Sequence, residues 1–301
     1  MNQPATAIEA FDLTLPHGIT LSCRACGPAD APRIVLLHGF PEAAFVWDEV
    51  MGLLGRRWRC IAPNLRGYER SSAPQEVQAY KPRALVADIA GLIEATGAPA
   101  ALLVAHDWGG AVAWNLAAQR PELLQRLMMV NSPHPATFLR ELQHNPAQQK
   151  ASAYMNWLCR PDAEALLSAD DFALLWRFFA GGRWLTEPVK QQYREVWRHG
   201  LTGPLNYYRA SPLKPPTPQD DSVLRMELPP GFGTVSMPTR VLWGEADVAL
   251  LPGLLDGLEA YLPQGEVVRV PGATHWIVHE QPALVAGQAE ALLAQPVMAG
   301  R

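Results

Sequence analysis

Residues 101–110 have the sequence Ala-Leu-Leu-Val-Ala-His-Asp-Trp-Gly-Gly, and this stretch decides the fold. Its apolar first half, Ala101–Ala105, predicts a short buried β-strand. The small residues that follow predict a helix over Gly109–Arg120. Asp107 then lies in a sharp turn that leads directly from a strand into a helix. Such a turn lifts one side chain above the carboxyl end of a sheet, which is where open α/β folds bind their ligands.

Strand and helix patterns alternate along most of the chain. Residues 8–26 predict two strands turned back at Pro16-His17-Gly18. Further strands are expected at Arg33–Leu37, Trp58–Ala62, Leu127–Val130, Thr239–Trp243 and Glu266–Val270. Helices are expected at Ala44–Leu54, Ala84–Thr96, Gly253–Tyr261 and Pro282–Leu293. Because the strands are apolar on both faces, the alternation predicts an α/β fold with a mostly parallel central sheet covered by helices on both sides.

The strand pattern stops between His134 and Leu228. This stretch contains four of the ten tryptophans and many helix-forming residues, but it has no run typical of a buried strand. We therefore expect a helical insertion over residues 134–228. The α/β core would then be formed by residues 1–133 together with residues 229–301.

The composition is that of a soluble globular enzyme. The chain has 301 residues, of which 49% are hydrophobic and 18% charged, and its net charge is −4. This charge gives no reason to expect nucleic acid or an anionic membrane as a partner. No apolar run reaches the ~18–20 residues that span a bilayer. Met1–Phe11 lacks the basic and apolar regions of a signal peptide, so a cytoplasmic location is expected.

No sequence signature of a cofactor or metal site stands out. The chain has no HExxH motif, no P-loop and no GxGxxG motif in a suitable setting. Cys23 and Cys26 have the CxxC spacing, but they lie in a predicted strand, and no second pair stands nearby to complete a zinc site. We expect reduced strand thiols at these positions, and we expect neither a metal nor a cofactor.

Two downstream residues complete a catalytic triad with Asp107. Asp247 follows the second-to-last predicted strand and His275 follows the last one, in the chain order nucleophile, acid, histidine. His275 is expected to act as the general base, while Asp247 orients its ring and stabilises the imidazolium. Glu245 is the nearby rival for the acid. His279 lies one helical turn beyond His275 and is expected to be a bystander.

A carboxylate nucleophile restricts the electrophile. An aspartate alkylated at sp³ carbon becomes an ester that a histidine-activated water can hydrolyse, whereas an alkylated serine would become an ether. Asp107 needs no activation, because a reference pKa of ~3.9 leaves it ionised at neutral pH. The residue therefore points to an epoxide or an alkyl halide. The backbone N–H groups of Phe40 and Trp108 are the expected donors to the oxyanion that forms during ester hydrolysis.

Three motifs resemble those of epoxide hydrolases of the α/β-hydrolase fold. They are His38-Gly39-Phe40-Pro41-Glu42, Arg66-Gly67-Tyr68-Glu69-Arg70-Ser71-Ser72-Ala73-Pro74 and His106-Asp107-Trp108-Gly109-Gly110. In the second motif the family more often has glycine where this chain has Glu69. The similarity extends from about Gly18 to Pro282. It implies that the insertion at residues 134–228 is a helical cap over the active site.

The resemblance also implies two proton donors in the cap. In this family two cap tyrosines hydrogen-bond the epoxide oxygen and protonate the alkoxide as the ring opens. Tyr208 matches the second of them, with Tyr207 at a position where the family usually has tryptophan, and Tyr154 matches the first. The chemistry needs such donors, because an alkoxide is a poor leaving group until it gains a proton. The implied partners are a small apolar epoxide and water. Whether the protein forms a homodimer is left open.

Two other functions stay open. A haloalkane or haloacetate dehalogenase shares the fold and the aspartate nucleophile. Haloalkane dehalogenases usually carry Asn or Glu at the position of Phe40. Fluoroacetate dehalogenases carry Arg where this chain has Trp108 and Ala111. Because the chain departs from the patterns of both kinds of dehalogenase, an epoxide is favoured over an alkyl halide as the substrate. A ligand receptor that kept the scaffold but lost turnover would have a broken triad, whereas all three triad positions are filled here.

Overall fold

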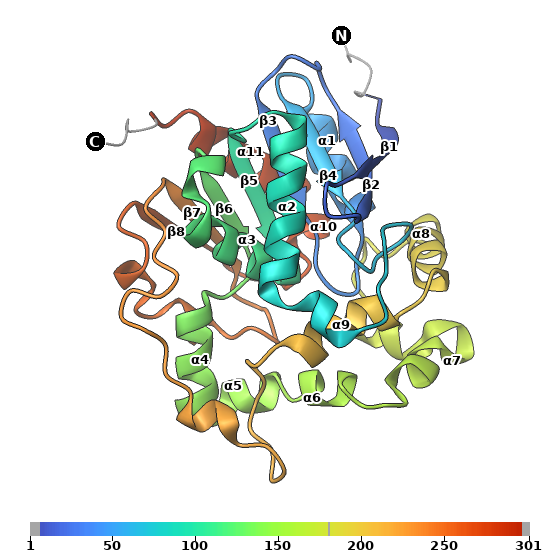
Figure 1. The fold of residues 1–301 in the computed structure, drawn as a ribbon, viewed down its shortest axis with the longest axis vertical. Coiled ribbons are helices and arrows are strands. Elements are labelled where there is room, and N and C mark those ends of the chain that lie inside the picture. The colour runs from blue at the N-terminus through green and yellow to red at the C-terminus, as the bar shows by residue number, and fades with distance from the viewer. Residues whose placement is uncertain (1–6, 180, 297–301) are drawn as a thin grey trace.

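Eight strands form a single sheet in the computed structural model, which describes residues 7–179 and 181–296 (Figure 1). The strands lie in the order β1-β2-β4-β3-β5-β6-β7-β8. Their bounds are β1 Glu9–Thr14, β2 Thr20–Cys26, β3 Arg33–Leu37, β4 Arg59–Pro63, β5 Leu102–His106, β6 Leu127–Val130, β7 Thr239–Gly244 and β8 Gly265–Val270. β1 pairs antiparallel with β2, and β2 with β4, whereas every pairing from β4 to β8 is parallel. The expected mostly parallel sheet is thus confirmed.

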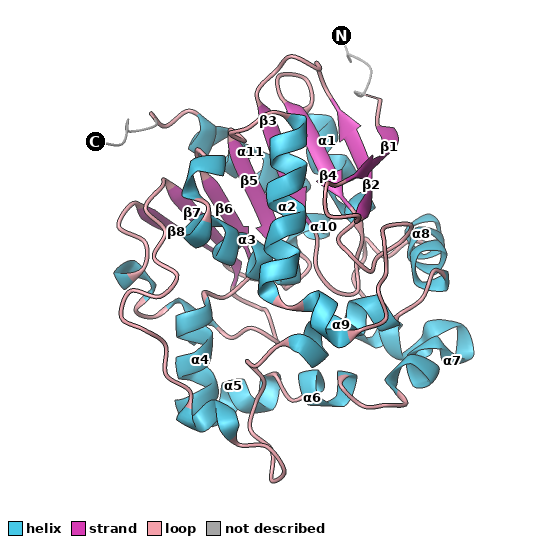
Figure 2. Cartoon of the chain, viewed as in Figure 1, coloured by secondary structure: helices cyan, strands magenta, loops and turns pink. Residues whose placement is uncertain are grey.

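Helices cover both faces of this sheet (Figure 2). One face packs against α2 and α3, and the other against α1 and α11. A short helix, α10, precedes α11. The bounds of these helices are α1 Asp48–Leu54, α2 Pro82–Thr96, α3 Asp107–Gln119, α10 Ile277–Glu280 and α11 Pro282–Leu293. The three-layer arrangement follows from the strand sequences.

Alternate residues of a central strand belong to different cores. In β3, Ile34 and Leu36 pack with the core beneath α1 and α11. Val35 and Leu37 pack with the core beneath α2 and α3. Successive side chains of a strand point to opposite faces, so a strand buried between two helical layers must be apolar at every position. This constraint explains the continuous apolar runs in the sequence.

The segment between β6 and β7 is helical. Within its described residues it forms no strand and contains α4 Pro135–His144, α5 Pro146–Ala151, α6 Tyr154–Leu158, α7 Ala163–Trp176, α8 Glu187–Arg198 and α9 Thr202–Ala210. Figure 1 shows these helices gathered at one end of the sheet. We refer to residues 134–228 as the helical segment. In the described part of the chain, no helix is both long and apolar enough to cross a bilayer.

One expectation about the last third of the chain is wrong. In place of a helix over Gly253–Tyr261, the structure has two short 3₁₀ turns separated by Gly257, whose φ of 73° no α-helix can accommodate. The strand expected at Glu266–Val270 is present as β8, which is the last strand in the sheet order and has Val267 40% exposed.

The N-terminal region matches its expected structure where it is described. Cys23 and Cys26 lie in β2 as buried free thiols. The expectation that Met1–Phe11 is not a signal peptide falls partly on residues 1–6, which lie outside the described residues. The described part of that stretch leads into β1 and thus into the edge of the sheet.

Glu69 occupies a backbone position suited to glycine. Its φ is 52°, in the left-handed region that costs a residue with a side chain about 1–2 kcal/mol. Its carboxylate accepts hydrogen bonds from the Ser22 hydroxyl, from Asn64 Nδ2 at 3.1 Å and from the Arg70 backbone N–H at 2.8 Å. Burial would raise the pKa of Glu69, but these hydrogen bonds hold it below its ordinary value. The side chain therefore offsets the strain that glycine would avoid.

Replacing Glu69 should separate these two effects. Glu69→Ala keeps the strained backbone and loses the hydrogen bonds, so we expect the free energy of unfolding to fall by about 1–3 kcal/mol. Glu69→Gly also loses the bonds but relieves the strain, so it should be more stable than the alanine variant by about 1 kcal/mol. Urea denaturation measures both values. Because the folded pKa is depressed, the difference between wild type and Glu69→Ala should shrink as the pH falls below the ordinary glutamate pKa. An alanine variant as stable as wild type would contradict this account.

Candidate active site

Asp107 sits at the junction of β5 and α3, with a left-handed φ of 49°. This sharp turn brings other chain segments very close to the helix start. A Cβ on Gly109 would lie 2.5 Å from the carbonyl oxygen of His38, and a Cβ on Gly110 would lie 2.2 Å from the Ser132 hydroxyl. Such distances are far below van der Waals contact, so these two positions require glycine. The small residues that flank Asp107 in the sequence are therefore a steric condition of the turn.

The loop after β3 contacts the Asp107 carboxylate directly. The Phe40 backbone N–H donates to Asp107 Oδ1 at 2.7 Å. A Cβ on Gly39 would lie 2.3 Å from the same oxygen, so the approach also requires glycine there. For the second expected donor, Trp108, the structure shows no hydrogen bond from its backbone N–H to the carboxylate. Of the two expected backbone donors, the Phe40 N–H thus already contacts the Asp107 carboxylate in the free protein.

His38 anchors this loop as a neutral ring. Its Nδ1 lies 2.9 Å from the Gly39 carbonyl oxygen, and its Nε2 accepts from the Leu65 backbone N–H at 3.0 Å. Complete burial lowers the pKa of His38 to about 4. A neutral ring with one donor and one acceptor satisfies both contacts, and it holds the Phe40 N–H at the carboxylate.

Asp247 and His275 meet beside Asp107. Asp247 Oδ2 lies 2.7 Å from His275 Nδ1, and the other ring nitrogen, Nε2, lies 3.7 Å from Asp107 Oδ2. Asn131 also donates to Asp247 Oδ2 at 2.8 Å, and the backbone N–H groups of residues 249–250 donate to its Oδ1. Asp247 is therefore held on both oxygens. The structure brings the three residues of the predicted triad together in the predicted relation.

The charges around His275 favour its protonated form. Burial alone would lower the pKa of this ring, but the charge and hydrogen bond of Asp247, with a smaller contribution from Asp107, raise it to about 9. Burial would likewise raise the pKa of Asp247, and His275 holds it below its ordinary value. The rival acid, Glu245, lies instead 3.5 Å from Arg269 at the surface.

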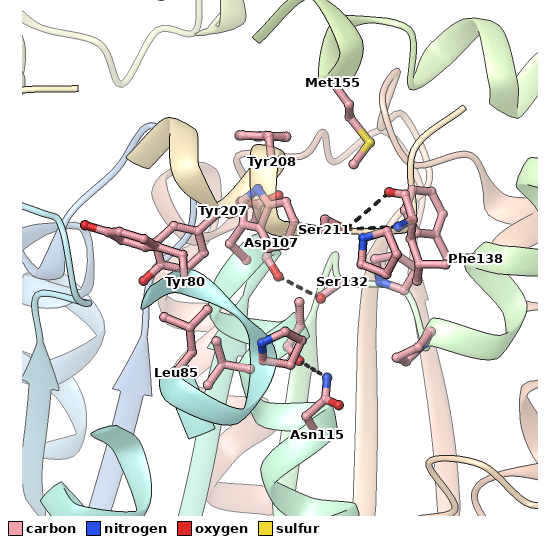
Figure 3. A pocket seen from close by; sticks show the side chains of 18 of the residues that line it. Tyr80, Leu85, Asp107, Asn115, Ser132, Phe138, Met155, Tyr207, Tyr208 and Ser211 are labelled. Atoms are coloured by element: carbon pink, nitrogen blue, oxygen red, sulfur yellow. Dashed lines mark hydrogen bonds between the residues drawn. The ribbon is translucent and has the colours of Figure 1, made fainter. Parts of the chain in front are cut away.

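Tyr154 and Tyr208 extend from α6 and α9 toward Asp107. Their ring centroids are 6.1 Å apart, and the ring of Tyr208 also packs edge-on against Trp108 at 5.0 Å. Figure 3 shows Tyr208 next to Asp107. Burial and the nearby negative charge of Asp107 raise the pKa of both phenols. Both hydroxyls therefore stay protonated and can act as donors. The neighbouring Tyr207 donates instead to the Arg66 carbonyl oxygen at 3.0 Å.

A cavity of about 210 Å³ opens between the sheet and the helical segment (Figure 3). Asp107, Trp108, Tyr154 and Tyr208 are part of its wall. Most of the other wall residues are apolar, among them Leu85, Ala111, Val112, Phe138, Met155, Leu213, Met226, Leu228, Phe232 and Leu250. An apolar cavity with a few polar groups at one place is typical of a site for a small organic molecule.

Glu42 forms a buried polar cluster that spacing in the sequence did not reveal. The side chain is fully buried, with Oε2 3.0 Å from His106 Nδ1. Its Oε1 lies 3.0 Å from His279 Nε2 and accepts from the Tyr193 hydroxyl at 3.1 Å. His279, the expected bystander, therefore connects the loop after β3 to helix α8. The sequence signal for this cluster was only that Glu42 and His106 belong to motifs shared with the resembled family.

Hydrogen-bond chemistry places a proton between Glu42 and His106. His106 Nε2 lies 2.9 Å from the carbonyl oxygen of His275, and a carbonyl only accepts, so Nε2 carries a hydrogen. The pair Glu42–His106 must then share one further proton at Nδ1. Burial would raise the pKa of Glu42, but the hydrogen bonds from His106 and His279 hold it far below its usual range. His106 thus links a buried carboxylate to the backbone of the triad histidine.

The ionisable side chains of the site bond to one another rather than forming a metal centre. Within residues 7–179 and 181–296, no three His, Cys, Asp or Glu side chains are arranged to hold a metal ion. The groups that remain are a carboxylate, an imidazole held by a second carboxylate, and two phenols. These groups suit nucleophilic and acid–base chemistry.

Comparisons with known proteins agree with this geometry. The family model of the alpha/beta hydrolase fold matches residues 32–282. The AB hydrolase superfamily protein YfhM of Bacillus subtilis is 37% identical, over 89% of this chain and 92% of that protein. Epoxide hydrolase 4 of Mus musculus is 29% identical, over 95% of this chain and 80% of that protein. A crystal structure of Bacillus megaterium epoxide hydrolase with an inhibitor superposes with a TM-score of 0.88 at 31% identity, covering 95% of this chain and all of that one.

The chain therefore belongs to the α/β-hydrolase fold family. Within that family it groups with the epoxide hydrolases, as the resemblance of its three motifs predicted.

Replacing Glu42 should test the buried cluster. Glu42→Gln keeps the shape but leaves buried ring N–H groups facing an amide, so the free energy of unfolding should fall by about 2–4 kcal/mol. Urea denaturation measures the change. Glu49→Gln, on an exposed position of α1, is the matched control and should stay within about 0.5 kcal/mol of wild type. Equal stability of the two variants would show that the cluster contributes nothing.

Proposed function

We propose that this protein hydrolyses epoxides to vicinal diols, through a covalent ester on Asp107, with residues 134–228 acting as a helical cap over the site. The observation that carries the proposal is the pairing of a carboxylate nucleophile with two protonated tyrosines in one apolar cavity. The similarity to proteins named epoxide hydrolases supports the same reaction. No cofactor is needed for it.

In the first step Asp107 opens the ring. Because Oδ1 accepts the Phe40 N–H, we assign the attack to Oδ2, the oxygen nearer to His275. A bond forms between Oδ2 and one epoxide carbon while the bond from that carbon to the epoxide oxygen breaks. Tyr208 and Tyr154 hydrogen-bond the departing oxygen and supply its proton. The product is an ester of Asp107 that carries a neighbouring hydroxyl.

In the second step His275 activates a water molecule. The water attacks the carbonyl carbon of the Asp107 ester, its proton passes to His275 Nε2, and Asp247 stabilises the imidazolium. The Phe40 N–H already contacts Oδ1, where negative charge develops. Collapse of the tetrahedral intermediate breaks the bond from the carbonyl carbon to the diol oxygen, and this oxygen takes the proton from His275. The diol leaves, Asp107 becomes a carboxylate again, and the proton that its carboxyl group loses returns to the tyrosine that supplied one in the first step.

Alkylation of Asp107 also prepares the histidine for this step. In the free protein the negative charge of Asp107 contributes to the raised pKa of His275, which favours the imidazolium. An ester is neutral, so this contribution disappears when the intermediate forms. The pKa of His275 then falls, and the ring becomes available as a base only when there is an ester to hydrolyse.

Three features of the site argue against the alternatives. The Phe40 side chain has no donor for a halide and packs against Phe178 and Tyr208 instead. At the position where a fluoroacetate dehalogenase has its second arginine, Ala111 lines the cavity. A receptor without turnover would have no need for the assembled contact between His275 and Asp247.

A panel of substrates tests the reaction. The purified protein is offered a styrene-oxide-type epoxide, a haloalkane and fluoroacetate, and diol, halide and fluoride are measured separately. We expect diol from the epoxide. Halide release without diol would overturn the proposal in favour of a dehalogenase, and ligand capture without any product would favour the receptor.

Two variants should separate the half-reactions. His275→Gln should accumulate a covalent adduct of the epoxide on the peptide that contains Asp107, seen by mass spectrometry, because ester formation does not need the base. Asp107→Asn should form no adduct. Normal turnover by His275→Gln would contradict the mechanism.

Removal of the Tyr208 hydroxyl should slow opening of the epoxide ring. For Tyr208→Phe we expect single-turnover ester formation to fall about 10²-fold, because the alkoxide then leaves with one proton donor fewer. Stopped-flow fluorescence of the site tryptophan follows this step. Tyr261→Phe, at a ring that stacks on His134 away from the cavity, is the control and should react at the wild-type rate.

A further inference from the structure

One face of α3 forms the floor of the cavity beyond the nucleophile. Asp107, Ala111 and Asn115 follow one another at intervals of four residues, and all three line the cavity. Side chains at this spacing lie on the same face of a helix. At a rise of 1.5 Å per residue, Asn115 lies about 12 Å along the helix from Asp107. Figure 3 shows Asp107 between Tyr208 and Asn115.

The wall between these two residues is apolar. Ala111 and Val112 of α3 and Pro82 and Leu85 of α2 are all part of the cavity wall. We call the stretch of the cavity along α3, from the Asp107 carboxylate to the Asn115 carboxamide, the apolar arm. A substrate that fills the arm has an apolar chain or ring between its epoxide and Asn115.

The Asn115 amide has hydrogen-bonding capacity left for a ligand. Its Nδ2 donates to the Ala111 carbonyl oxygen at 2.8 Å, which uses one of two hydrogens. Its Oδ1 has only a 3.5 Å contact with the exposed Gln119. By contrast, the hydroxyls of Ser132 and Tyr207, also in the wall, donate to backbone carbonyl oxygens. Asn115 thus keeps a donor and an acceptor at the end of the arm.

The charge of the cavity restricts the ligand group further. None of the described residues in its wall is Lys, Arg or His, and its one acidic side chain is the Asp107 carboxyl group. A carboxylate or phosphate at the end of the arm would find no opposite charge. An uncharged group that both donates and accepts, such as a hydroxyl or an amide, matches what Asn115 offers.

We propose that Asn115 is a specificity-determining residue, which selects epoxides whose apolar chain or ring carries an uncharged hydrogen-bonding group at its far end. This inference rests on the proposed function. The amide binds the far group and so holds the chain in the arm, with the epoxide carbon at Asp107 Oδ2. A ligand held at both ends samples fewer unproductive positions, which raises kcat/KM.

Pairs of substrates test the inference. Terminal epoxyalkanes are compared with the same chains carrying a hydroxyl at the far end, over a series of chain lengths. Wild type should prefer the hydroxylated member at the length that spans the arm. Asn115→Leu, which is close in size but has no polar group, should lower the ratio of kcat/KM for that substrate to kcat/KM for the plain epoxyalkane about 3- to 10-fold.

A control variant and the possible outcomes distinguish a failure of this inference from a failure of the proposed function. Gln119→Leu, one turn further along α3 and outside the cavity wall, should keep the wild-type preference. If Asn115→Leu changes kcat/KM equally for both members of each pair, the inference is wrong while the proposed function stands. If wild type forms diol from neither member and from no other epoxide, the proposed function itself fails.

Discussion

The backbone at Asp107 changes from the extended conformation of β5 to the helix α3 within one residue, and it does so with a positive φ. This conformation costs about 1–2 kcal/mol, and the surrounding structure has to hold it. The Ser132 hydroxyl donates to the Asp107 carbonyl oxygen at 2.8 Å, and the Phe40 N–H holds the carboxylate. Close packing against glycines at 39, 109 and 110 leaves no room for another arrangement. The position of Asp107, the proposed nucleophile, is therefore set by sterics, and the rest of the site is built around it.

The buried cluster at Glu42 contacts the same turn, because Glu42 bonds the ring of His106, the residue before Asp107. Through His106 it reaches the carbonyl oxygen of His275, and through Tyr193 it reaches the helical segment. A buried carboxylate is stable only where opposite charge and donors surround it. The cluster consequently links the nucleophile's neighbour, the loop that carries the Phe40 N–H and the loop of the triad histidine in one set of hydrogen bonds.

Much of the fold could be predicted from the sequence, because each central strand is buried on both faces and so is apolar throughout. The triad followed from chain order, since the carboxyl ends of parallel strands meet at one edge. Other features could not be predicted. The helix expected over 253–261 fails at Gly257, whose φ is left-handed, and the carbonyl oxygens of Gly253 and Asp256 accept hydrogen bonds from Arg140, more than 100 positions away. Glu42 and His279 are 237 positions apart, and no local spacing shows that they touch.

The attachment of the helical segment has an evolutionary consequence. Asp107, Asp247 and His275 lie just beyond the carboxyl ends of β5, β7 and β8, whereas both tyrosines lie on helices inserted between β6 and β7. Mutations in the inserted stretch can therefore reshape what the cavity admits without disturbing the geometry of the bond-forming residues. The range of substrates can therefore change in evolution through substitutions in single helices of this segment, while the position of Asp107 stays the same. Asn115 is the exception, because it lies on the same helix as Asp107, so selectivity at that end must change together with the most constrained element of the protein.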